Sequence, residues 1–154
     1  MKMLNSADLC IIIPTFNRKK QLSVLLHQFK QQKSNGIRFN IVLVVDGSTD
    51  GTIELLESEF PEVIIVKGSG NWWFTRSLNE GCKYAVDVLN AKLILTINDD
   101  VQLPDTYLQK IMDNYAECGP NSIIGASSYS ASKPSVITFS GIRRKSPWTL
   151  KHYK

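Results

Sequence analysis

The stretch LILTINDDV, residues 93–101, decides the fold because it joins an apolar run to a sudden cluster of polar residues. Its first five residues are apolar or β-branched, which is typical of a strand buried on both faces. The run then ends in Asn98, Asp99 and Asp100, and two adjacent carboxylates repel each other unless a cation or a donor offsets their charge. Two interpretations follow: a strand end that holds a divalent cation over a crevice, or a solvated loop that caps the next helix.

Similar apolar runs recur along the chain and alternate with helical patterns. Buried strands are predicted at residues 9–13, 41–45, 63–66 and 93–97. Helices with apolar side chains three to four residues apart are predicted at residues 18–32, 52–60, 73–89 and 105–115. Short strands are expected at residues 122–126 and 136–139, on either side of a serine-rich loop at residues 127–135.

Strands that are apolar throughout and separated by helices predict an α/β fold of three layers, α/β/α, around a mostly parallel central sheet. Right-handed crossovers place every strand-to-helix turn at one edge of such a sheet. Ligands bind beyond that carboxyl edge, where the strand order reverses. We therefore expect the four turns that follow the strands to form one site.

The composition is that of an ordinary globular domain. The chain has 154 residues, of which 43% are hydrophobic and 21% charged, enough for one domain with its own core. The longest apolar run, residues 9–13, is too short to span a membrane, and residues 1–8 show no secretory signal. Three scattered cysteines without a CxxC pair favour reduced thiols, and hence a cytoplasmic location, over a disulfide frame or a zinc site.

The charge is unevenly distributed. Residues 1–117 hold 12 Lys and Arg against 14 Asp and Glu, whereas residues 118–154 hold six basic residues and no acidic one. The basic end, which includes Arg143, Arg144 and Lys145, would suit an anionic phosphate or a membrane surface. No aromatic platform or amphipathic helix accompanies these charges, which favours a solvated tail or the cut end of a longer chain over either of these contacts, and no nucleic-acid partner is expected.

The four turns contain charged side chains that the backbone geometry of a turn does not require. Turns need Gly, Asp and Ser for their backbone geometry. They do not need a carboxylate after the second strand (Asp46), a cation after the third (Arg76) and paired carboxylates after the fourth. Together these groups could hold a nucleoside, a diphosphate and a metal ion.

Four motifs carry a resemblance to a known family. They are IIIPTFNR at residues 11–18, VVDGSTDGT at 44–52, GNWWFTRSLNEG at 70–81 and INDDV at 97–101. In order and spacing, across about residues 9–126, they resemble the nucleotide-sugar-binding half of a family 2 glycosyltransferase of the GT-A fold. The paired tryptophans are most similar to bacterial rhamnosyltransferase-like members.

The resemblance implies roles for residues of the first two turns. Thr15 and Asn17 would line the nucleoside pocket, and Pro14 beside them would also bind the nucleotide sugar. Asp46 would accept hydrogen bonds from the base or ribose, as an acceptor-only carboxylate can. Asp46 and Asp50 also have a purely structural interpretation, in which they form the turn and cap the helix that follows.

The third and fourth turns complete the implied site. Arg76 lies where the family places a cation that contacts the base or phosphate, and Asp99 would bind the nucleotide sugar. Asp100 matches the last Asp of the family's DXD metal motif, which implies Mg²⁺ or Mn²⁺ as cofactor. Asn98 replaces the first Asp of that motif, and the lost charge should weaken the metal site. Of Trp72 and Trp73, we expect one in the core and one near the sugar.

The implied reaction transfers a sugar from a nucleotide-diphosphate donor, with inversion, to a glycan or lipid-linked acceptor of a bacterial surface polysaccharide. The enzyme would be cytoplasmic or peripheral at the inner face of the plasma membrane. Such a reaction needs an Asp or Glu as general base, and no acidic residue follows Glu117. We therefore expect residues 1–126 to be the donor-binding half and residues 127–154 the start of a truncated acceptor-side region.

These expectations leave three hypotheses. The chain binds a nucleotide sugar but transfers it poorly because no catalytic base is found. Alternatively, a homodimer or another partner supplies the acceptor site. In the third, the chain is a non-catalytic nucleotide-sugar-binding or interaction module that uses its basic end.

Overall fold

The chain divides into two compact units, Met1–Gln109 and Lys110–Lys154, which are described separately. The computed structural model describes residues 8–34, 36–130, 132–133, 135–139, 142–146 and 149–152, and from residue 142 on it describes the backbone alone. The expected boundary at residue 126, and the assignment of residues 127–154 to an acceptor side, stay predictions.

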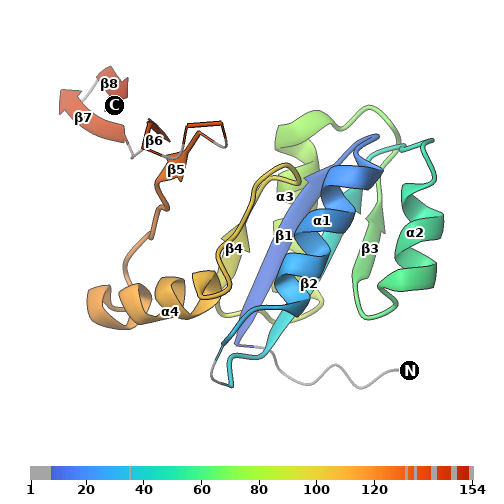
Figure 1. Ribbon diagram of the computed structural model, residues 1–154, viewed down its shortest axis with the longest axis horizontal. Coiled ribbons are helices and arrows are strands. Elements are labelled where there is room, and N and C mark those ends of the chain that lie inside the picture. The colour runs from blue at the N-terminus through green and yellow to red at the C-terminus, as the bar shows by residue number, and fades with distance from the viewer. Residues whose placement is uncertain are drawn as a thin grey trace. The chain divides into compact units, whose positions relative to one another are not determined.

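A four-stranded parallel sheet in the order β3-β2-β1-β4 forms the centre of the first unit (Figure 1). Its strands are β1 (Leu9–Thr15), β2 (Phe39–Val45), β3 (Ile64–Lys67) and β4 (Ile94–Thr96). In register, Ile11 of β1 lies between Ile41 of β2 and Leu95 of β4. The four strands predicted to be buried are all present, with ends shifted by at most two residues.

The helices cover both faces of this sheet, which confirms the predicted three-layer arrangement (Figure 1). They are α1 (Lys19–Lys30), α2 (Thr52–Glu59) and α3 (Trp73–Asp87). A further helix, α4 (Tyr107–Cys118), begins in the first unit and continues into the second. The chain moves outward from β1 to β3 and then returns to the other side of β1 for β4. Because each crossover is right-handed, this reversal places α1 and α2 on one face and α3 on the other.

Alternate side chains of the central strands build two cores. Ile11 and Ile13 of β1 pack with Leu22 and Leu26 of α1 on one face. On the other face Ile12 packs with Ala85 of α3, and these residues are fully buried. Consecutive apolar residues of a strand are therefore buried on opposite faces of the sheet, as the uninterrupted apolar pattern predicts.

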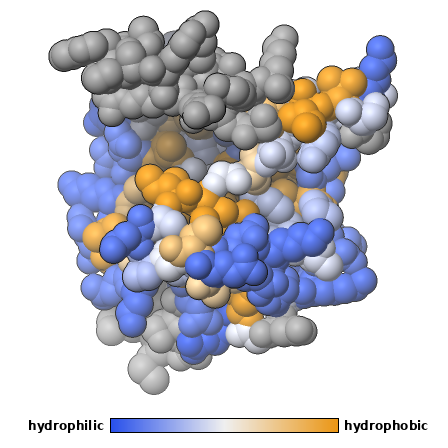
Figure 2. Space-filling view, turned by 90° about the vertical axis from the view of Figure 1, so that its left-hand side faces the viewer, coloured by the Kyte–Doolittle hydropathy of each residue, from blue (hydrophilic) through white to orange (hydrophobic). Residues whose placement is uncertain are grey.

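The edge formed by β4 is less well covered than the centre of the sheet. Ile94 of β4 is 37% exposed, and Val86 and Val88 near the end of α3 are also exposed. Figure 2 views the molecule from the side on which β4 lies in Figure 1 and shows hydrophobic surface among hydrophilic side chains. Among the described residues, no helix is long and apolar enough to cross a membrane.

Two small antiparallel sheets form part of the second unit. One pairs β5 (Ser128–Tyr129) with β6 (Ile137–Phe139), and the other pairs β7 (Ile142–Ser146) with β8 (Thr149–His152). The backbone of Arg143, Arg144 and Lys145 thus belongs to β7, while the side chains of the basic end lie outside the described residues.

The strand predicted at residues 122–126 is wrong. This stretch is irregular and Ile123 is fully exposed. Two neighbouring isoleucines between Pro120 and Gly125 point to opposite sides of a strand, so they cannot give one apolar face. The strand lies instead inside the predicted serine-rich loop, where the hydroxyls of Ser128 and Thr138 form a hydrogen bond of 2.8 Å across the β5–β6 pair.

Gly81 explains how closely α3 lies on the sheet. A glycine inside a helix costs about 1 kcal/mol relative to alanine. Here a Cβ atom at position 81 would lie 2.5 Å from Ile12 Cγ2 and 2.9 Å from Val44 Cγ2. The glycine therefore permits a close helix–sheet contact that no larger residue allows.

We predict that Gly81→Ala destabilises the protein, although alanine favours the helix. Overpacking typically costs about 1–3 kcal/mol, which exceeds the gain of about 1 kcal/mol in helix propensity. Urea unfolding should therefore show a lower free energy of unfolding, by about 1 kcal/mol or more. Asn79→Ala, at an exposed position of the same helix, is the matched control and should be neutral or stabilising. Equal stability of the Gly81 variant and the wild type would contradict the close contact.

Candidate functional site

A cleft of about 480 Å³ lies at the carboxyl ends of β1, β2 and β4. Its lining residues are Pro14, Thr15, Phe16, Arg18, Asp46, Gly70, Trp73, Phe74, Ser77, Asn98, Asp99 and Asp100. The cleft includes the position where the strand order reverses, between β1 and β4. Five residues expected at the site, Pro14, Thr15, Asp46, Asp99 and Asp100, therefore come together here.

Asp46 organises the wall of the cleft at the end of β2. Its carboxylate is buried, and Oδ1 accepts a hydrogen bond of 2.7 Å from the backbone N–H of Gly70. Oδ2 accepts from the N–H groups of Trp72, at 2.7 Å, and Trp73, at 2.9 Å. Three backbone donors converge on one side chain, which holds the start of α3 against β2. Contact between Asp46 and a base or ribose stays a prediction.

Glycines let the second and third turns approach each other. Gly47 has a φ of 73°, and a Cβ there would lie 2.6 Å from Gly70 Cα. A Cβ at Gly68 would lie 2.5 Å from Asp46 Oδ1. These positions exclude every side chain, and the result is a backbone wall beside the Asp46 carboxylate.

Asp99 lies at the bottom of the cleft. Thr15 Oγ1 donates a hydrogen bond of 2.7 Å to Asp99 Oδ2, which links the ends of β1 and β4. Burial raises the pKa of the Asp99 carboxyl above its ordinary value, although the Thr15 hydrogen bond and the Arg18 charge act in the opposite direction. The first carboxylate of the pair is therefore fixed in place and largely removed from water.

Arg18 supplies a cation to the acidic pair. Its Nη1 donates to Asp100 Oδ2 at 2.6 Å, and its Nε lies 3.8 Å from Asp99 Oδ1. Arg18 and Asp100 are both almost half exposed, so this ion pair contributes at most about 1 kcal/mol and can exchange partners. Sequence reasoning assigned Arg18 no role. The available signal was its position in the turn directly after β1.

The paired carboxylates Asp99 and Asp100 could hold a divalent ion only if a bound substrate supplied further oxygen ligands. The part of the chain that the structure describes contains no cluster of three or more His, Cys, Asp or Glu side chains suited to a metal. Mg²⁺ is commonly held by one or two carboxylates together with substrate phosphates. Asp100, with Asp99 beside it, fits a site in which one or two carboxylates and a bound phosphate hold the ion together. A divalent ion there would compete with Arg18 for the carboxylates.

Asn17 and Arg76 are not among the residues that line the cleft. Asn17 joins the first two turns, because its Oδ1 accepts from Thr49 N–H at 2.7 Å. Arg76 is exposed, lies 5.2 Å from the ring centre of Trp72 and approaches Glu80 at 3.9 Å. Their roles in nucleotide binding stay predictions.

Asp50 has a structural role at the start of two helices. Its Oδ1 accepts from the N–H of Thr52, at 3.2 Å, and from the Thr52 hydroxyl, at 2.5 Å. Its Oδ2 accepts from the N–H of Lys19 at 2.9 Å. This carboxylate thereby fixes α1 and α2 relative to each other, in keeping with its structural interpretation.

Two residues on the α3 side of the cleft are held in unfavourable states. Trp73 has a φ of 57°, in the left-handed region, and is 83% exposed, whereas Trp72 packs against the core on that face. Ser77 is buried, and its Oγ has no hydrogen-bond partner in the described structure. Such a backbone conformation and such a hydroxyl each cost about 1–3 kcal/mol. Sequence reasoning missed Ser77, because only the packing of α3 shows that its hydroxyl is unpaired.

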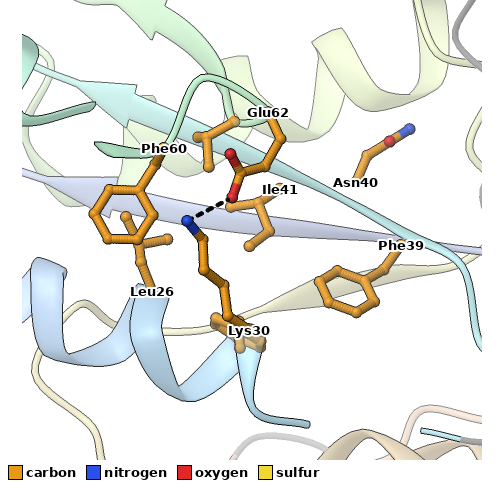
Figure 3. Close-up of a pocket in the computed structure, with 9 residues that line it drawn as sticks. Leu26, Lys30, Phe39, Asn40, Ile41, Phe60 and Glu62 are labelled. Carbon is orange, nitrogen blue, oxygen red and sulfur yellow. Dashed lines mark ion pairs between the residues drawn. The ribbon is translucent and has the colours of Figure 1, made fainter. Parts of the chain in front are cut away.

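A second cavity, of about 270 Å³, lies at the opposite edge of the sheet, around the start of β2 (Figure 3). Its wall is mainly apolar, with Leu26 and Phe39 among the lining residues. Lys30 lies 4.4 Å from the ring centre of Phe60 and pairs with Glu62 at 3.2 Å. None of the residues predicted to bind a ligand lines this cavity.

Comparison with known proteins identifies the relatives of the chain. The model of the protein family described as "Glycosyl transferase family 2" matches residues 10–151 of the chain. The glycosyltransferase AglJ of Haloferax volcanii is 31% identical over 117 residues, which are 75% of this chain and 35% of AglJ. The chain thus spans about a third of the length of this relative.

Solved structures share the fold. TarS 1–349 of S. aureus, solved in complex with UDP-GlcNAc, has a TM-score of 0.62 and 22% identity, covering 71% of this chain and 31% of that one. The mannosyltransferase PcManGT from Pyrobaculum calidifontis, in complex with GDP-Man and Mn²⁺, has a TM-score of 0.53 and 19% identity, covering 65% and 29%. These likenesses confirm the predicted fold of nucleotide-sugar transferases.

We predict that Asp46→Asn lowers the free energy of unfolding by about 2–4 kcal/mol. The asparagine amide would direct its NH₂ group toward backbone N–H donors that a carboxylate now satisfies, and charge-assisted hydrogen bonds contribute about 1.5–3 kcal/mol each. Chemical unfolding measures the change. Asp100→Asn makes the same charge change in an exposed ion pair and should cost no more than about 1 kcal/mol. If the two variants were equally stable, Asp46 would not organise the cleft.

Proposed function

The chain belongs to glycosyl transferase family 2, and we propose that its cleft binds a nucleotide-diphosphate sugar as the donor for transfer of the sugar with inversion. The observation that supports this most directly is the convergence of Thr15, Asp46, Asp99 and Asp100 on one cleft. The buried acceptor Asp46 suits the nucleoside of such a donor, and the nearby cation Arg18 suits its diphosphate. The acidic pair suits the metal ion that would accompany the diphosphate.

The diphosphate binds beside Asp100. Asp100 and Asp99 are the residues that would hold Mg²⁺ or Mn²⁺, and the ion would neutralise charge that develops on the departing diphosphate. Arg18 now balances the two carboxylates at 2.6 Å and 3.8 Å. With Asp99 and Asp100 holding a metal, the Arg18 guanidinium would be free to donate to the phosphate oxygens. Asn98 adds no charge, so the metal affinity depends on the diphosphate.

The nucleoside extends from the diphosphate toward β2. Because β1 lies between β4 and β2 in the sheet, Asp46 is on the far side of Thr15 from Asp100. Pro14, Thr15 and the backbone wall around Gly70 border that part of the cleft. Asp46 holds this wall in place through its three hydrogen bonds and is available to a base or ribose donor at its remaining lone pair.

The acceptor side of the reaction needs groups that this cleft does not supply. No Asp or Glu follows Glu117 in the sequence, and the carboxylates of the cleft already have the roles given above. In this proposal the cleft binds the donor, and the base that activates the acceptor comes from outside the cleft, for instance from a partner or a second copy of the chain. The acceptor is a glycan or lipid-linked precursor of a surface polysaccharide at the inner face of the membrane, a proposal supported by the rhamnosyltransferase-like motifs alone.

We expect calorimetric titration of the full chain with UDP, GDP and dTDP to show binding of at least one of them. The affinity should rise at least about tenfold in the presence of Mn²⁺, because the ion offsets repulsion between the diphosphate and Asp100. Asp100→Asn should remove most of this dependence on Mn²⁺.

The control for that titration is Asp87→Asn, which removes one exposed carboxylate from the end of α3. It should bind nucleotide and Mn²⁺ as the wild type does. Failure of all three nucleotides to bind, with and without Mn²⁺, would exclude the proposed function. An equal effect of the two substitutions would instead show that only the overall charge matters.

A further inference from the structure

We propose that Trp73 and Ser77 form the subsite for the nucleobase, with the indole stacking on the base and the hydroxyl bonding to its polar edge. The inference rests on the proposed function, since it assigns two residues to one part of the donor. Both residues line the cleft, and both are in states that destabilise the free protein.

Trp73 is an exposed aromatic residue in a strained conformation. Its φ of 57° is rare for a bulky side chain, and its N–H is held by Asp46 Oδ2 at 2.9 Å. Such a conformation persists only where the surroundings impose it, and it is concentrated at ligand sites. The side chain is 83% exposed, so it contributes little to the core. Both the strain and the exposure are explained if the indole contacts a planar ligand.

Ser77 presents an unused hydroxyl on the same wall. It is 2% exposed, and its Oγ has no partner among the described residues. A serine in a helix commonly bonds to the carbonyl one turn earlier, and this one does not. Both residues line the cleft, Ser77 from the body of α3 and Trp73 from the left-handed residue at its start. One residue offers a ring face and the other a donor and acceptor.

The position of this wall favours the base over the sugar. Trp73 is tied to Asp46 at the end of β2, whereas the acidic pair follows β4, on the other side of β1. A diphosphate beside Asp100 has its nucleoside at one end and its sugar at the other. The nucleoside end reaches toward β2, and there the base meets Trp73 and Ser77.

The test compares Trp73→Gly and Ser77→Ala with the wild type by calorimetry, using UDP, GDP, dTDP and inorganic pyrophosphate, each with Mn²⁺. Loss of stacking should weaken the binding of the nucleotide by about tenfold or more in Trp73→Gly. Loss of one hydrogen bond should weaken it by about threefold to tenfold in Ser77→Ala. Pyrophosphate, which has no base, should bind all three proteins equally.

The Tm of the protein without ligand distinguishes a binding role from a structural one. If the two residues had a structural role, their substitution would lower Tm, whereas a binding role predicts a rise. Glycine adopts positive φ without strain, and alanine removes the unpaired hydroxyl, so both variants should raise Tm by about 3 °C. Thr75→Gly, at an exposed helical position beside the cleft residues, is the control and should lower Tm without a change in nucleotide affinity.

The outcomes separate this inference from the proposed function. If the wild type binds neither nucleotide nor pyrophosphate, the proposed function fails, and the base subsite fails with it. If the wild type binds nucleotide and both variants bind it equally well, only the base subsite is overturned. A parallel loss of nucleotide and pyrophosphate affinity, or a fall in Tm in both variants, would show that the two residues have a structural role.

Discussion

The buried carboxylate of Asp46 is the interaction on which the cleft depends. It binds three backbone N–H groups between Gly70 and Trp73, and so it links the end of β2 to the start of α3. A carboxylate can satisfy several convergent donors because it carries only acceptors. Without it, three backbone N–H groups of the third turn would lose their hydrogen-bond partner. The wall that carries Trp73 and Ser77 is thus a consequence of one side chain.

The sheet topology explains why this wall faces the acidic pair. The strand order reverses at β1, so the carboxyl ends of β1 and β4 are neighbours, and the Thr15–Asp99 hydrogen bond of 2.7 Å joins them. All four turns that follow the strands therefore contribute residues to one cleft, although these residues are far apart in the sequence. The close contact of α3 with β1 and β2 at Gly81 brings the first turn of that helix to the same edge. Fold and site depend on the same constraints.

Much of this arrangement is predictable from the sequence, and the exceptions have physical reasons. Apolar runs such as residues 41–45 identify the strands because a sheet covered on both faces needs them. The strand at Ser128–Tyr129 is not predictable in this way, because cross-strand hydroxyl contacts rather than burial accompany its pairing. The ion pair of Arg18 with Asp100 requires knowledge that the first and fourth turns are neighbours. The unpaired state of Ser77 depends on details of packing that residue types do not encode.

The central claim is that one ligand, a nucleoside diphosphate, occupies the cleft at the carboxyl edge of the sheet. Amide NMR spectra of the ¹⁵N-labelled chain, titrated with UDP, GDP or dTDP in the presence of Mg²⁺, test it directly. The account predicts that the largest shift changes fall on residues 15–18, 46–47, 70–77 and 98–100, around the cleft at the carboxyl edge of the sheet. Changes centred on the second cavity, around Phe39 and Phe60, or no changes at all with any of the three nucleotides, would contradict it.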